Sequence, residues 1–117
     1  MNSAPDKKHL RALLRHRRSA LFLQEQTYAA QAVYNKIMTL NPFEVSKNIA
    51  FYKAHDGEVS IDKVLTKAQT IRKNCYLPVL HSYQHHLDFY SCHLENPLIK
   101  NRFGIEELIS FKKNLFP

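Results

Sequence analysis

Two residues near the middle of the chain, Tyr52 and Glu58, have the chemistry of a pocket for a flat heterocycle. A carboxylate can accept paired N–H groups from such a ring, and a charge-assisted bond of this kind is stronger than a neutral one. A tyrosine can stack on the face of the ring. Each residue also has a purely structural explanation. Glu58 at the start of a helix would gain about 0.3 to 1 kcal/mol from the helix dipole, and Tyr52 would fill the core.

A second set of candidates is the cationic ridge near the N-terminus, where Lys7, Lys8 and Arg11 precede Arg15 and Arg18. Steps of three and four residues place most of these side chains on one stripe of a helix. Converging cations suit a polyphosphate such as that of ATP, because the chain has only two glycines and no glycine-rich loop. The alternatives are a solvated helix face and nucleic-acid binding, and the lack of interleaved aromatic residues for base stacking argues against nucleic acid.

Histidine and cysteine do not define a metal site or a nucleophile. His81 with His85 or His86, and Cys92 with His93, match no established ligand spacing. Cys75 is far from Cys92 in sequence, and neither lies in a recognisable Cys/His signature. We therefore predict no metal site, and no catalytic residue is identified from these patterns.

We expect the N-terminal third of the chain to form two amphipathic helices. The first begins near Ser3 and runs to about Ser19, with an apolar stripe expected to dock on a core. The second spans residues 25–40, and the Asn-Pro step at residues 41–42 ends it. Its buried stripe is expected to comprise Tyr28, Ala29, Ala32, Val33, Ile37 and Leu40.

A βαβ unit follows. Residues 48–53 predict a strand, Asp56-Gly57 a turn, residues 60–74 a helix and residues 75–80 a second, parallel strand. Residues 87–92 predict another strand, and residues 96–117 show no strong period. The predicted fold class is α/β, a small, mostly parallel sheet with flanking helices. Ligands bind beyond the carboxyl ends of such strands, which puts residues 52–58 at the expected site.

Composition places the chain among soluble globular proteins. It has 117 residues, 44% hydrophobic and 23% charged, and a formal net charge of +7. This size predicts a single domain spanning residues 1–117. No apolar run is long enough for a membrane span, no secretion signal is evident, and cysteine usage favours a reducing, cytoplasmic setting.

Five segments in order resemble the 5-formyltetrahydrofolate cyclo-ligase family, also called methenyltetrahydrofolate synthetases. They are the cationic opening at residues 7–18, Ile49-Ala50-Phe51-Tyr52 leading to Asp56-Gly57-Glu58-Val59, residues 73–79, Leu87-Asp88-Phe89, and Asn101 to Glu107. No segment is specific alone, and the resemblance rests on their order across nearly the whole chain.

The resemblance implies ATP- and Mg2+-dependent ring closure of 5-formyltetrahydrofolate to 5,10-methenyltetrahydrofolate. It also implies that Lys7, Lys8 and Arg11 contact ATP, that Glu58 binds the pterin, and that Tyr52 forms a wall of the folate pocket. Family members continue into a Gly-rich phosphate loop after the segment matching residues 104–107, and Leu108 stands where the family usually has proline. We therefore expect an incomplete fold and little or no turnover from this chain alone. The alternatives are a non-catalytic folate- or nucleotide-binding module that self-associates through exposed sheet edges, and nucleic-acid binding through the basic helix.

Overall fold

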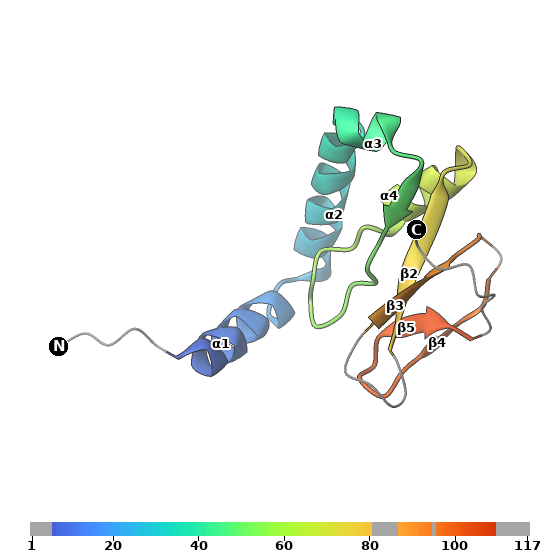
Figure 1. Ribbon diagram of the computed structural model, residues 1–117. Coiled ribbons are helices and arrows are strands. Elements are labelled where there is room, and N and C mark those ends of the chain that lie inside the picture. The colour runs from blue at the N-terminus through green and yellow to red at the C-terminus, as the bar shows by residue number, and fades with distance from the viewer. Residues whose placement is uncertain (1–5, 81–86, 95, 110–117) are drawn as a thin grey trace.

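The structure is a computed structural model that describes residues 6–80, 87–94 and 96–109 (Figure 1). These ranges contain four helices and five strands. In chain order they are α1 (Lys7–Ser19), α2 (Leu23–Ile37), α3 (Asn41–Val45), β1 (Asn48–Ala50), α4 (Asp62–Thr70), β2 (Asn74–Leu80), β3 (Leu87–Ser91), β4 (Leu98–Lys100) and β5 (Glu106–Leu108).

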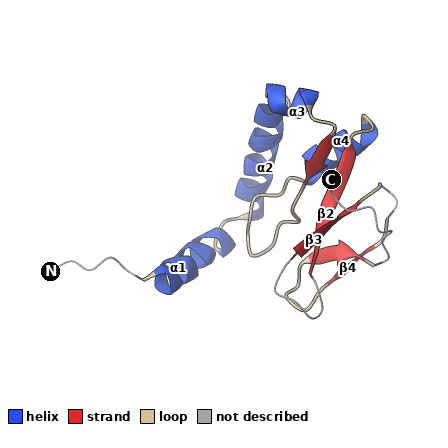
Figure 2. Ribbon diagram, in the orientation of Figure 1, coloured by secondary structure: helices blue, strands red, loops and turns tan. Residues whose placement is uncertain are grey.

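The predicted βαβ unit is confirmed. β1 and β2 pair in parallel, from Asn48 opposite Asn74 to Ala50 opposite Tyr76, with α4 between them in the chain. The α/β class is therefore confirmed, but the expectation of a mostly parallel sheet is wrong in the described residues. β3 pairs antiparallel with β2, because residues 81–86 are too few for the crossover that a parallel neighbour needs. Figure 2 shows the resulting three-stranded mixed sheet, in the order β1-β2-β3.

The core lies where α4 packs on β2. Ala68 and Leu77 are fully buried, and Val64 and Leu65 of α4 are nearly so. Half-buried residues of α2, including Tyr34 and Ile37, pack against the same cluster. Burial also raises the pKa of the Cys75 thiol to about 11, so this thiol behaves as a small core residue at neutral pH.

Helix α1 begins at its cap residue Asp6, whose carboxylate accepts a hydrogen bond from the His9 N–H at 2.7 Å. The start that the sequence predicts, near Ser3, lies outside the described residues. The expected docking of the α1 leucines is wrong for the described chain, since none of its residues is buried and Leu10 is 42% exposed. The helix instead projects from the body of the molecule (Figure 1). With α1 included, the molecule measures 53 × 39 × 26 Å.

The second helix, α2, begins and ends two to three residues earlier than the pattern predicts. Only part of its expected buried stripe is covered, because Tyr28 is 78% exposed while Val33 and Ile37 are half-buried. The break at Asn41-Pro42 is real, but it opens the short helix α3, where Pro42 occupies the first turn without losing a backbone hydrogen bond.

The hairpin of β4 and β5 was not predicted, because its strands are too short to show a period. The connecting turn is organised by Asn101, whose side-chain oxygen accepts hydrogen bonds from the N–H groups of Phe103 at 2.9 Å and Ile105 at 3.1 Å. Gly104 takes a φ of +78°, which favours glycine. Part of the Asn101 to Glu107 segment, one of the five that carry the family resemblance, is thus a turn. No helix in the described ranges is both long and apolar enough to cross a lipid bilayer.

The core position of Leu77 and the exposure of Leu10 give opposite expectations for truncation. Leu77→Ala should lower the free energy of unfolding by about 2 to 5 kcal/mol, because a cavity replaces a fully buried side chain. Leu10→Ala is the matched control and should cost much less. Urea denaturation followed by circular dichroism measures both, and equal losses would contradict the core described here.

Candidate functional site

The loop after β1 turns sharply at Asp56 and Gly57, as the sequence predicts. Both residues have positive φ, at 51° and 75°. The Glu58 N–H donates to the His55 carbonyl at 3.1 Å, and Glu58 Oε1 accepts from the His55 N–H at 2.9 Å. The turn therefore fixes the Glu58 side chain, with one carboxylate oxygen engaged by the backbone.

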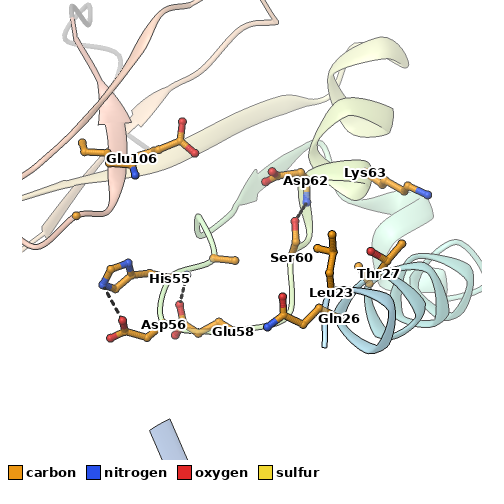
Figure 3. Close-up of a pocket in the computed structure, with 15 residues that line it drawn as sticks. Leu23, Gln26, Thr27, His55, Asp56, Glu58, Ser60, Asp62, Lys63 and Glu106 are labelled. Atoms are coloured by element: carbon orange, nitrogen blue, oxygen red, sulfur yellow. Dashed lines mark hydrogen bonds and ion pairs between the residues drawn. The ribbon is translucent and has the colours of Figure 1, made fainter. Parts of the chain in front are cut away.

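A pocket of about 670 Å³ opens beside this loop, a volume within the usual range for small-molecule sites. The loop supplies residues 54–58 and Ser60, and α2 lies across from it with Gln26 and Thr27 (Figure 3). The start of α4 and the β4–β5 hairpin complete the lining. The remaining lining residues are Leu23, Ala30, Asp62, Lys63, Lys100, Gly104 and Glu106.

Four carboxylates line the pocket, and three of them have a cationic partner in the described structure. Asp56 lies 3.4 Å from Arg15 Nε and 3.3 Å from His55 Nε2. Asp62 and Glu106 lie 2.8 Å and 3.9 Å from Lys53 Nζ. Within the described residues Glu58 makes no ion pair. It is therefore the lining carboxylate whose charge is available to a ligand.

Tyr52 supports the loop from the side. Its hydroxyl donates to the Val59 carbonyl, and burial, followed by the negative charges of Glu58 and Asp62, raises the pKa of the phenol. The side chain does not line the pocket, and it is 42% exposed, so it is not a core residue either. Its predicted role as a wall of a folate pocket remains a prediction.

The end of α1 contacts the loop closely. A Cβ on Gly57 would lie 2.7 Å from the backbone carbon and oxygen of Arg18, so no side chain fits there without movement. Arg15 pairs with Asp56 across the same contact. On the far side of the loop, a Cβ on Gly104 would lie 3.2 Å from His55. The loop is therefore held between α1 and the β4–β5 turn.

The predicted ATP contacts lie elsewhere on α1. Lys7, Lys8 and Arg11 are all exposed, and none of them lines the pocket. They share the helix with Arg15 and Arg18, which do reach the loop. The structure thus joins the cationic ridge to the pocket through α1 but does not gather it around Glu58.

Several lining residues were missed by sequence reasoning, among them Asp62, Lys100 and Glu106. No local pattern identifies them, because α2, the loop, α4 and the hairpin meet only in the folded chain. A metal site is likewise not apparent in the structure, since no cluster of three or more His, Cys, Asp or Glu side chains able to hold an ion occurs in the described ranges.

Comparison with known proteins gives the family. The family model of the 5-formyltetrahydrofolate cyclo-ligases matches residues 3–115, nearly the whole chain. This chain belongs to the 5-formyltetrahydrofolate cyclo-ligase family. The resemblance that the ordered motifs indicated is therefore confirmed.

Curated cyclo-ligases show how much of a family member is present. The 5-formyltetrahydrofolate cyclo-ligase of Haemophilus influenzae is 33% identical over 112 residues, which are 95% of this chain and 60% of that protein. The Escherichia coli K12 cyclo-ligase is 30% identical over 96 residues, covering 81% of this chain and 53% of the relative. The chain thus spans between half and two thirds of the length of these relatives.

Solved structures of the cyclo-ligase family share the fold. The 5,10-methenyltetrahydrofolate synthetase of Aquifex aeolicus superposes with a TM-score of 0.75 at 25% identity, covering 91% of this chain and 53% of that one. The synthetase of Mycoplasma pneumoniae has a TM-score of 0.65 at 24% identity, covering 75% and 54%. The second likeness shows the fold alone.

The contact between Gly57 and α1 predicts an unequal pair of glycine substitutions. Gly57→Ala should destabilise the chain more than Gly104→Ala, although both residues have positive φ. The new methyl group at residue 57 meets rigid backbone at 2.7 Å, whereas at residue 104 it meets the His55 side chain at 3.2 Å. Urea denaturation ranks the two variants. Hydrogen exchange should also accelerate at residues 15–18 in Gly57→Ala, and an unchanged rate there would contradict the contact.

Proposed function

We propose that this chain carries the folate-binding part of a 5-formyltetrahydrofolate cyclo-ligase, with cations for ATP on its first helix. The observation that carries the proposal is the Glu58 carboxylate, which makes no ion pair among the described residues and lines a pocket of suitable size in a chain of this family. The proposed substrate is 5-formyltetrahydrofolate, and the product of the complete reaction is 5,10-methenyltetrahydrofolate.

Glu58 fits the pterin end of the folate. Its Oε1 is already oriented by the His55 N–H, so the other oxygen and the remaining lone pairs can accept N–H groups of the ring. A hydrogen bond to a charged acceptor contributes about 1.5 to 3 kcal/mol, more than a bond between neutral groups. Because Asp56, Asp62 and Glu106 already have cationic partners, Glu58 is the carboxylate with most to gain from such a ligand.

The α1 cations fit an anionic co-substrate. Lys7, Lys8 and Arg11 are exposed, and the first turn of the helix contains no acidic residue, so their charge is not neutralised within α1. These residues would hold the phosphates of ATP, which is the donor of the family's reaction. When bound, ATP supplies the phosphoryl group that turns the formyl oxygen into a leaving group.

The described residues fit Mg2+ less well than ATP. No cluster of three or more acidic, histidine or cysteine ligands forms within those ranges, so the chain's own described side chains do not build a cage for the ion. We therefore assign no step of the reaction to the metal. What these residues do is bind the ring at Glu58 and present cations on α1.

We also propose that residues 1–117 form one domain. The buried residues of α4, β2 and β5, together with Phe51 after β1 and Cys92 after β3, make a single cluster. Residues of α2 pack against this cluster from outside, so α2, α4 and the sheet share one core.

Glu58→Gln tests the folate site. Glutamine keeps an oxygen for the His55 N–H but removes the charge, so affinity for 5-formyltetrahydrofolate should fall about 10- to 100-fold. Isothermal titration calorimetry measures the dissociation constant. Glu44→Gln, the same change on exposed α3, is the control and should bind like the parent.

Two outcomes would count against this proposal. Equal affinities of the Glu58→Gln variant and the parent would remove Glu58 from the site, and absence of binding by the parent chain would remove the folate pocket. Absorbance assays with ATP then separate two forms of the proposal. ATP-dependent formation of 5,10-methenyltetrahydrofolate assigns the whole reaction to this chain, whereas binding without turnover assigns the folate site alone.

A further inference from the structure

Lys53 is a largely shielded cation that contacts two residues of the pocket lining. Its side chain is only 10% exposed, although it follows β1 by three residues and belongs to the loop segment. Its Nζ lies 2.8 Å from Asp62 Oδ1 and 3.9 Å from Glu106 Oε1. We call these three residues the Lys53 ion cluster.

The cluster joins two separate sides of the pocket. Asp62 lies in the first turn of α4, whereas Glu106 begins β5, and both line the cavity. In Figure 3 their side chains approach one another from these two elements. A single ammonium therefore lies within ion-pair distance of both the helix and the hairpin.

Burial distinguishes this ion pair from the others in the described structure. The difference lies in the cation, since Arg15 is 61% exposed, where water screens an ion pair, and Lys53 is 10% exposed. Asp62 and Glu106 are themselves 55% and 47% exposed, so it is the lysine that is shielded, and removing it leaves two carboxylates without their cation. The charge also acts on the core. Burial raises the pKa of the Cys92 thiol, and the positive charge of Lys53 counteracts part of that rise.

The cluster also sets the charge that a ligand meets. The described pocket lining carries four carboxylates and two lysines, Lys63 and Lys100. Lys53 compensates two of those carboxylates, and Arg15 compensates Asp56. Without Lys53 the pocket would present an anionic ligand with two further unpaired negative charges.

We propose that Lys53 is a positioning and specificity-determining residue of this pocket: by holding Asp62 and Glu106 together it fixes the wall and leaves Glu58 as the acceptor for ligand N–H groups. The inference rests on the proposed folate site. Lys53 acts through the two carboxylates it holds and does not itself line the cavity.

The first experiment tests the cluster without any ligand. Lys53→Met should lower the urea midpoint clearly, whereas Lys67→Met, the same change on an exposed residue of α4, should leave it close to that of the parent. In double-mutant cycles the loss caused by Lys53→Met should shrink in an Asp62→Asn background, and shrink less with Glu106→Gln, because 3.9 Å is the longer contact. Equal midpoints for both lysine variants, or additive losses, would overturn the cluster.

The second experiment tests its effect on the ligand by titrating 5-formyltetrahydrofolate into each variant. Lys53→Met should weaken binding about tenfold, since two carboxylates of the pocket lining would lose their cation and repel an anionic ligand. Lys53→Arg, which keeps the charge, should bind more tightly than Lys53→Met. If Lys53 only stabilised the fold, its replacement would lower the fraction of protein able to bind, measured as a lower binding stoichiometry. The dissociation constant would then stay unchanged.

The two experiments fail separately. If the parent does not bind 5-formyltetrahydrofolate, the proposed function fails, and the stability cycles still decide whether the cluster exists. If the parent binds and the cycles show coupling, but Lys53→Met has the parent's dissociation constant, the role in specificity is overturned. Should Lys53→Met fail to fold, Lys53→Arg and Asp62→Asn carry the same comparison.

Discussion

The parallel pairing of β1 with β2 is the constraint on which the rest of the structure depends. Parallel neighbours need a crossover, and here the crossover consists of a turn, an extended segment and α4. The first part of that connection leaves the carboxyl end of β1. The chain then returns through α4, which packs on the sheet. The Asp56-Gly57 turn, Glu58 and Lys53 all lie on this stretch. The site is thus a consequence of the topology, and the side chains on the connection determine what it can bind.

Regular patterns made the β1-α4-β2 unit predictable. Val64, Leu65 and Ala68 recur at helical spacing and are buried, and Cys75 to Leu80 is an apolar run of strand length. The Asp56-Gly57 step predicts its turn because both residues tolerate positive φ. These features are local, since each depends on neighbours a few residues away. Glu58 was found for the same reason, as it follows the turn directly.

The rest of the site could not be predicted because it depends on contacts between distant segments. Asp62 is a good first-turn residue for α4 by sequence alone, and its place beside Lys53 and Glu106 emerges only when the hairpin folds onto the sheet. The α1 leucines gave a wrong prediction. Their spacing predicts a buried stripe, whereas the described chain leaves them exposed. Periodicity indicates that a face is apolar, but it does not say what covers it.

Because Arg18 lies against Gly57, a tilt of α1 about this contact would move the other end of the helix most. From Arg18 to Lys7 the helix extends roughly 17 Å, so a tilt of about 10° at Arg18 would displace Lys7 by about 3 Å. A slight adjustment of the loop around a ring at Glu58 would therefore be magnified at the cations. The proposed ring contact at Glu58 and the proposed phosphate contacts on α1 would then be linked through the helix.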